Sequence, residues 1–142
     1  MIKIAVVKYN NKEVQLLARL MRAEAEGDGE LGMLLVGNVG INRVRANCLD
    51  FKDINSIERM VFQRPGGFEA TTQSYFYQAS RSMDEKLAMR VINGERFVPA
   101  TTALWFYNPF DEDCRANWFG QWNSGRYKSH CFYQPLESEN CY

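Results

Sequence analysis

The sequence predicts an α+β fold in which the first two-thirds of the chain are mostly helical and a small aromatic β region lies at the C-terminal end. In the N-terminal part, apolar residues recur at three- and four-residue steps, as they do in amphipathic helices. After Pro99, β-branched and aromatic residues dominate, and more than half of the Phe, Trp and Tyr residues lie in 105–142. Helices followed by strands are typical of the α+β class.

The length and composition describe an ordinary globular chain. Its 142 residues are near the usual size of one domain and are enough to bury a core. Hydrophobic residues make up 46% and charged residues 24%, as in typical soluble domains. Because no repeat, low-complexity tract or Pro/Ser-rich linker divides the chain, we expect a single domain over residues 1–142.

The charge balance excludes some classes of partner. Lys and Arg together number 17, as do Asp and Glu, so no net field attracts nucleic acid or an anionic membrane. The apolar run at 4–7 is too short for the core of a signal peptide, and no stretch is long enough to span a bilayer. We expect no nucleic-acid partner, no membrane span and no export by the usual route.

Two long helices are predicted first. One covers about 12–26 and carries a single apolar stripe. The next covers about 30–45 and combines three glycines with many apolar residues, which indicates a central buried helix that other backbones approach closely. Asn38 and Asn42 share one face of this helix, and each is expected to make a scaffold hydrogen bond or to line a cleft.

Two shorter helices and two strands are predicted next. The residues at 55–58 resemble a capping box that opens a helix to about Gln63. A second box at 82–85 opens another helix, which Asn-Gly at 93–94 closes. The stretches "TTALWFY" and "RYKSHCFY" are the strand candidates, and an Asn-Pro turn ends the first of them.

The cysteines do not predict a metal site. No pair has the two-residue spacing of a zinc or redox motif, and the chain has one histidine, so we expect neither metal nor cofactor. Without a signal peptide, reduced thiols with packing roles are the expectation. The alternative is a disulfide among Cys114, Cys131 and Cys141 if the final compartment is oxidising. The four residues are Cys48, Cys114, Cys131 and Cys141.

Glu24 is an unusual residue for its position. On a helical wheel it falls inside the apolar arc of the first helix, next to Leu17 and Met21. Burial raises the pKa of a carboxyl because the charged form loses solvation, and a carboxyl that keeps its proton near neutral pH can act as a general acid. Gly27 and Gly29 open the chain just beyond. We therefore expect Glu24 to be mostly buried at a helix end, facing a groove.

A structural role is the alternative for Glu24. Buried acids often pair with an arginine or cap a neighbouring helix, and Arg43 or Arg45 is available for such a pair. The apolar pattern by itself favours the structural role.

Four stretches of the chain carry a family resemblance. They are "LLARLMRAEAEGDGELGMLLVGNVGINRV", "VFQRPGGFEA", "ALWFYNP" and "KSHCFYQP", and they extend from about residue 16 to 135. In this order they resemble the SleB/CwlJ family of spore cortex-lytic cell-wall hydrolases. Within the family the resemblance is to the CwlJ branch, which is similarly short and lacks a separate peptidoglycan-binding domain.

The resemblance implies a lysozyme-like fold related to lytic transglycosylases, which acts on the glycan strands of spore cortex peptidoglycan during germination. The family's catalytic glutamate lies in a Glu-Ala-x-Gly pattern, which here begins at Glu24. The SleB branch usually has an acid after this glycine, which makes Asp28 a second catalytic candidate. The single expected domain is then a catalytic one.

The number of candidate carboxylates bears on the reaction. Glycoside hydrolases usually use two carboxylates that flank the bond, whereas only Glu24 stands out here. As the resemblance implies, a lytic transglycosylase works with one, and the C6 hydroxyl of muramic acid replaces water as the nucleophile. The alternatives are a hydrolytic muramidase or glucosaminidase, with Asp28 as partner, and a catalytically silent binding module.

Residues that bind sugar are expected to combine rings and polar groups. Aromatic rings stack on apolar sugar faces, while polar side chains bind hydroxyl and N-acetyl groups. The alternative to sugar binding is core packing for Trp105, Trp118 and Trp122. For His130 the alternative is the role of a hydrogen-bonded core residue. The expected substrate contacts are Gln63, Phe68, Tyr107, Asn108, His130 and Asn42, with Trp105, Trp118 and Trp122 as further candidate rings.

The CwlJ branch also implies a location and a partner. The expectation is deposition by the mother cell, without a signal peptide, at the boundary of spore coat and cortex. A spore-coat protein partner would hold the enzyme there, and calcium dipicolinate would activate it in germination.

Overall fold

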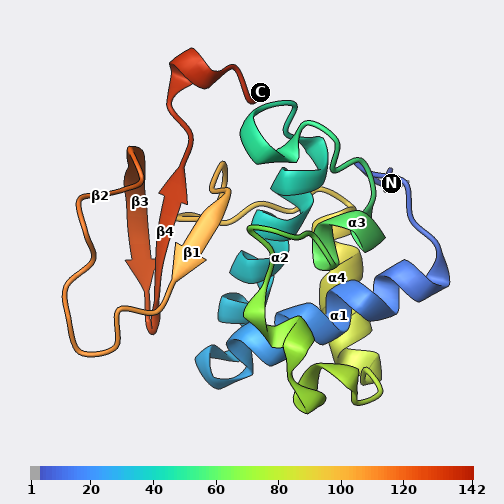
Figure 1. Ribbon diagram of the computed structural model, residues 1–142. Helices are drawn as coiled ribbons and strands as arrows, with labels where there is room; N and C mark the ends of the chain where they lie inside the picture. Colours follow the sequence, from blue (N-terminus) through green and yellow to red (C-terminus); the bar gives the residue numbers. More distant parts are fainter. Residues whose placement is uncertain (1–3) are drawn as a thin grey trace.

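The computed structural model describes residues 4–142 and places a helical part beside a small antiparallel sheet (Figure 1). The predicted order of helices first and strands last is confirmed. Short 3-10 turns connect the main elements. The helices are α1 (Asn11–Ala25), α2 (Gly29–Arg45), α3 (Ile57–Val61) and α4 (Ser82–Ile92), and the strands are β1 (Trp105–Tyr107), β2 (Asn117–Trp118), β3 (Gln121–Tyr127) and β4 (His130–Gln134).

Helix α1 begins at a side-chain cap and ends just after Glu24. The Asn10 side chain accepts a hydrogen bond from the backbone N–H of Glu13 at 2.8 Å, which satisfies one of the first unpaired donors of the helix. The predicted apolar stripe is buried, with Leu17 and Met21 fully enclosed. This face packs against α2 and α4.

Helix α2 is the central element, as predicted from its glycines. Nearly all of its length is buried. A Cβ atom at Gly37 would lie 2.9 Å from Met21 Cε and 3.0 Å from Val91 Cγ2, and one at Gly40 would lie 2.9 Å from Met60 Cε. The glycines therefore let α1, α3 and α4 pack directly against the α2 backbone.

The two shorter helices are confirmed, but their caps are shifted from the predicted ones. Ser56, and not Asn55, accepts from the Arg59 N–H at 3.1 Å at the start of α3. At the start of α4, Asp84 Oδ2 accepts from the Arg81 N–H at 3.1 Å, so Asp84 takes the place expected for Glu85.

The four strands form one antiparallel sheet in the order β1-β4-β3-β2. Strand β1 is the edge strand nearest the helices (Figure 1). Phe132 on β4 packs with Leu35 and Val39 of α2, which joins the sheet to the helical part. The prediction that "RYKSHCFY" is one strand is wrong, because a turn with Lys128 at φ 48° divides it between β3 and β4.

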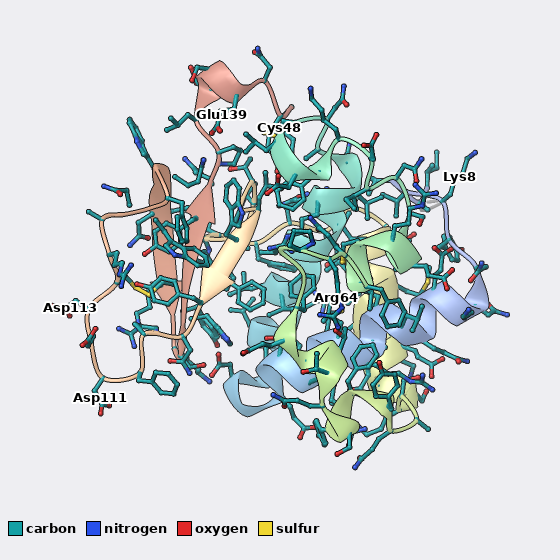
Figure 2. All side chains as sticks on the ribbon, in the orientation of Figure 1. Lys8, Cys48, Arg64, Asp111, Asp113 and Glu139 are labelled. Carbon is teal, nitrogen blue, oxygen red and sulfur yellow. A yellow bond between two sulfur atoms is a disulfide. The ribbon has the colours of Figure 1, made fainter. Side chains whose placement is uncertain are left out.

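All four cysteines form disulfides, so the expectation of reduced thiols is wrong. Cys48 pairs with Cys141 and Cys114 pairs with Cys131, with Cα–Cα distances of 4.9 Å and 5.8 Å that suit a disulfide. Figure 2 shows Cys48 near the C-terminal segment that carries Glu139. The first pair links residues 93 positions apart, which no local spacing reveals. Over residues 4–142, no helix has the length and apolar character that crossing a membrane needs.

Candidate active site

A groove of about 800 Å³ separates the helical part from the sheet. All three residues of β1 line it, and both parts contribute residues to it. The helical part contributes Glu24, Arg43, Leu49, Asp50, Phe51, Gln63, Gly66, Gly67, Phe68 and Glu69, and the sheet part contributes Trp105, Phe106, Tyr107, Asn108, Phe110, Trp118, Phe119, Gln121 and His130.

Glu24 lies in the last turn of α1 and lines this groove. It is mostly but not fully buried, as the sequence predicted. Burial raises the pKa of its carboxyl above the ordinary value, and the negative charge of Glu69 acts in the same direction. The Ala70 backbone N–H and the Arg43 charge oppose the rise without cancelling it. The result is a carboxyl that holds its proton to higher pH than an exposed glutamate does.

The helix end that carries Glu24 is held in place by its neighbours. Glu26 receives hydrogen bonds from Arg22 Nε at 3.1 Å and from the Tyr75 hydroxyl at 2.7 Å. Arg81 adds an ion pair to the same carboxylate at 3.0 Å. These contacts fix the last turn of α1 to the segments that precede and begin α4, so the position of Glu24 is set by the scaffold.

Arg43 is a buried cation that lines the groove. Its guanidinium lies over the rings of Phe51, at 5.0 Å, and Phe68, at 4.5 Å. It donates to the carbonyls of Leu104 at 2.8 Å and Gly66 at 3.2 Å. Burial lowers its pKa to about 10, so it stays charged at neutral pH.

The structural alternative for Glu24 had two forms, a cap on a neighbouring helix and a pair with an arginine. The cap has a counterpart in the backbone N–H of Ala70, in the 3-10 turn Glu69–Thr72, which bonds to the Glu24 carboxyl. Within residues 4–142 no ion pair joins Glu24 to Arg43 or Arg45. Arg43 directs its donors to carbonyl groups, and Arg45 is exposed. Arg43 therefore acts on Glu24 through its charge and not as a paired counter-ion.

Asp28 does not line the groove, but it contacts His130, which does. Its Oδ2 accepts from the Ser129 hydroxyl at 2.6 Å and lies 3.0 Å from His130 Nδ1. Because a carboxylate only accepts, Nδ1 is the donor, and Nε2 is the ring nitrogen that can serve a ligand. Lys128 Nζ donates to the Asp28 backbone carbonyl at 3.3 Å. Asp28 thus connects the end of α1 to the β3–β4 turn.

The remaining residues that were predicted to bind substrate divide into those that line the groove and those that support the fold. Gln63, Phe68, Tyr107, Asn108 and His130 all line the groove. Asn42 does not, because its amide donates to the carbonyls at positions 100, 101 and 103, which is the scaffold role. Trp105 and Trp118 line the groove as well, whereas Trp122 is 64% exposed outside it.

Two glutamines in the groove have an unused acceptor. Gln63 Oε1 and Gln121 Oε1 are buried, and neither has a hydrogen-bond partner within the described chain. The amide nitrogen of Gln63 donates to the Asp50 carbonyl at 3.4 Å, and that of Gln121 donates to Glu139 Oε2 at 3.3 Å. Buried acceptors are nearly always paired, so these two oxygens are suited to a donor on a ligand.

Comparison with known proteins gives the family. A family profile described as Cell Wall Hydrolase matches residues 27–133, which is most of the chain. The chain belongs to this cell wall hydrolase family. The match begins just after Glu24, so the glutamate itself lies outside the matched segment.

Relatives and solved structures agree with this membership. "Cell wall hydrolase CwlJ" of Halalkalibacterium halodurans is 59% identical over 136 residues, which cover 96% of this chain and 94% of that protein. A "Spore cortex-lytic enzyme" of Bacillus cereus is 28% identical over 101 residues, which cover 71% of this chain and 36% of that protein. The catalytic domain of the germination-specific lytic transglycosylase SleB of Bacillus anthracis superposes with a TM-score of 0.71 at 24% identity, over 89% of this chain and 97% of that one. The chain therefore has the fold of this catalytic domain, and the predicted α+β class is confirmed.

Sequence reasoning missed several groove residues of this cell wall hydrolase. Glu69 belongs to a quoted motif, but only the fold brings its charge near Glu24. Phe110 and Phe119 are 79% and 87% exposed, and both have a positive φ that a Phe residue rarely adopts. The Phe-Gly pair before Gln121 was the available signal for a hairpin turn at that point.

Proposed function

We propose that this protein cleaves the glycan strands of spore cortex peptidoglycan during germination, as a lytic transglycosylase with Glu24 as its single catalytic acid and base. One observation carries the proposal: a carboxyl with a raised pKa lies at a fixed helix end and lines a groove of about 800 Å³. The printed functions of the relatives, cell wall hydrolase and spore cortex-lytic enzyme, support the substrate class. We also propose that residues 1–142 act as one catalytic domain.

In the first step Glu24 acts as the acid. It gives its proton to the glycosidic oxygen as the bond from that oxygen to C1 of muramic acid breaks. The raised pKa supports this step, because the protonated form must be present near neutral pH. The carboxylate that remains is stabilised by the Ala70 N–H and the Arg43 charge.

In the second step Glu24 acts as the base. Its carboxylate takes the proton of the muramic C6 hydroxyl while that oxygen bonds to C1. The product is a 1,6-anhydro end, Glu24 has its proton back, and no water is consumed. His130 Nε2 and Gln63 Oε1 are proposed to bind hydroxyl or N-acetyl groups and hold the sugar in place.

Hydrolysis is the second candidate reaction, and Glu69 is the observation that favours it. Glu69 lines the groove and acts electrostatically on Glu24, so two carboxylates are present after all. Asp28, the partner first considered, is engaged by Ser129 and His130 instead. Mass spectrometry of digested cortex fragments separates the reactions. Anhydro ends are the expected result, and reducing ends would overturn the transglycosylase assignment in favour of a muramidase or glucosaminidase.

A catalytically silent coat module is the remaining alternative. Such a module needs a surface for its partner but has no use for an acid of raised pKa that lines a groove. If the purified wild-type protein leaves cortex fragments intact under conditions in which it stays folded, the silent-module alternative replaces the enzyme.

We further propose that a spore-coat protein partner holds the enzyme at the boundary of coat and cortex. A net charge of zero gives little general attraction to a polyanionic wall, and a small groove alone binds glycan weakly. A partner raises the local concentration of enzyme beside its substrate. In spores that lack the partner, the enzyme should be missing from the coat fraction. Its presence there at normal levels would contradict recruitment.

A further inference from the structure

The groove is longer than the chemistry around Glu24 requires. His130, which is tied to the end of α1 through Asp28, lies at one end of the β3–β4 hairpin, where it pairs with Tyr127. Gln121 begins β3 at the opposite end of the same hairpin. At about 3.3 Å per residue, the two ends are roughly 20 Å apart, and both line the same groove. This length accommodates several sugar rings in a row.

The far end presents an aromatic ring to solvent at an energetic cost. Phe119 is 87% exposed and lies at φ 51°, in the turn where Gly120 follows at φ 83°. Turns of this kind normally use Asn or Gly, and a bulky residue held there is strained. A strained backbone that holds a ring out toward solvent is not explained by core packing, and the position of the ring in the groove lining points to a ligand.

The ring is also backed by other aromatic residues. Trp118 lies 5.5 Å from Phe119 and 5.0 Å from Tyr107, measured between ring centroids. Tyr107 and Trp118 both contact the buried Tyr133, whose hydroxyl donates to the Arg115 carbonyl at 2.6 Å. The exposed ring is therefore the outer member of a stack anchored in the sheet.

A polar group of the right kind lies beside this stack. Gln121 Oε1 is buried in the same part of the groove without a hydrogen-bond partner, and Glu139 holds the amide nitrogen of the same side chain. A sugar ring has an apolar face and a rim of hydroxyl or N-acetyl donors. The rings of Phe119 and Trp118 suit the face, and Gln121 Oε1 suits a donor on the rim.

We infer that Phe119, Trp118 and Gln121 form a second sugar-binding subsite, remote from Glu24, that makes the enzyme favour long glycan strands over short fragments. This inference rests on the proposed function, because it assigns the groove to a glycan. A strand that spans the groove contacts both ends, whereas a short fragment bound at Glu24 leaves the far subsite empty.

The first test is Phe119→Asn, with cleavage rates measured on long cortex glycan strands and on short fragments. Asn removes the ring and tolerates positive φ, so the midpoint of unfolding should stay the same or rise. The ratio of the long-strand rate to the short-fragment rate should fall about tenfold. An unchanged ratio, or an equal fall on both substrates, would overturn the subsite.

Trp122→Ala is the matched control. Trp122 is an exposed ring one residue beyond Gln121, but it lies outside the groove lining. Its removal should leave the ratio of rates unchanged. If this variant lowers the ratio as much as Phe119→Asn does, the effect belongs to sheet aromatics in general and the subsite is wrong.

Binding separates this inference from the proposed function. In a Glu24→Gln background, calorimetry should show that long strands bind more tightly than short fragments, and that Gln121→Leu or Phe119→Asn removes about tenfold of this advantage. If the advantage survives both changes, the subsite is wrong while the assignment of Glu24 still stands. If Glu24→Gln cleaves normally, the proposed mechanism fails, and the ratio of long-strand to short-fragment cleavage rates in Phe119→Asn still tests the subsite.

Discussion

The two walls of the groove differ in chemistry and in how the chain builds them. The helical wall places Glu24, Glu69 and Gln63 around the buried cation of Arg43. The sheet wall is dominated by rings, and its polar members arise from turns and strand ends. We interpret the first wall as the place of proton transfer and the second as the place of recognition. The contrast indicates that reactivity depends on burial in rigid helices, and recognition on exposed rings.

Besides the packing of Phe132 against α2, two long-range contacts join the walls. At the Glu24 end, Asp28 binds Ser129 and His130 of the β3–β4 turn. At the other end, the Cys48–Cys141 disulfide joins the segment after α2 to the C-terminal tail. The long loop between β1 and β2, which carries Asp111 and Asp113, lies on the side away from the helices (Figure 2). Changes to the helical wall, the sheet wall and the two joints should therefore have separable effects.

Glu24→Gln tests the helical wall and should have the largest effect. The change keeps the shape of the side chain but removes the proton, so cleavage should fall by about 10²–10⁴-fold. Because the folded-state pKa of Glu24 is raised, ionisation costs stability as pH rises from the ordinary glutamate pKa through the raised value. The variant should therefore unfold at an equal or higher temperature at pH 7, and this advantage should vanish in acid.

Glu30→Gln is the control for that experiment. Glu30 is an exposed glutamate near the start of α2 and does not line the groove. It should retain normal cleavage. Near-normal lysis by Glu24→Gln would remove the catalytic assignment of this wall.

The disulfides should affect stability unequally. Replacing both Cys48 and Cys141 by Ser opens a loop of 93 residues and should lower the free energy of unfolding by about 4.6 kcal/mol, while the 17-residue loop of Cys114 and Cys131 should cost about 3 kcal/mol. Denaturant unfolding of the two double variants gives the comparison. A larger loss from the shorter loop would mean that local contacts of the sheet wall, and not loop length, decide the order.

The helical wall could be predicted from the sequence to a large extent. Helices α1 and α2 lie within a residue or so of their expected bounds, because apolar periodicity is a local signal. The Glu24 position followed from that periodicity together with the quoted motif. Five of the six expected substrate contacts line the groove. The sixth, Asn42, makes scaffold hydrogen bonds instead, and the sequence could not reveal them because the carbonyl partners lie about sixty residues away.

The sheet wall and the joints could not be predicted in the same way. The β3–β4 turn uses Lys128 at positive φ, where sequence rules look for Gly or Asn, so one strand was expected instead of two. The contact between Asp28 and His130 spans 102 residues, and Cys48–Cys141 spans 93. Such pairings depend on tertiary structure that no local pattern specifies.

Asp28→Asn tests the joint beside Glu24. The change removes the charge that strengthens the hydrogen bonds from Ser129 and His130, so the free energy of unfolding should fall by about 2 kcal/mol. The catalytic rate should fall about tenfold, because His130 loses its fixed orientation. Asp111→Asn, on the exposed loop, is the control. If Asp28→Asn lowers stability but leaves the rate and its pH profile intact, Asp28 is only a structural contact.

Glu69→Gln tests the electrostatics within the helical wall and should have the smallest effect. The charge of Glu69 raises the pKa of Glu24, so its removal should lower that pKa. The proposed acid works only while protonated, and the high-pH limb of the rate profile should therefore move to lower pH. The move should be small, because Glu69 is exposed and solvent screens its charge. High salt should reduce the shift, because it screens the charge of Glu69 in the wild-type protein. If Glu69→Gln instead abolishes cleavage at every pH, Glu69 takes part in the reaction, and the two-carboxylate hydrolase replaces the transglycosylase.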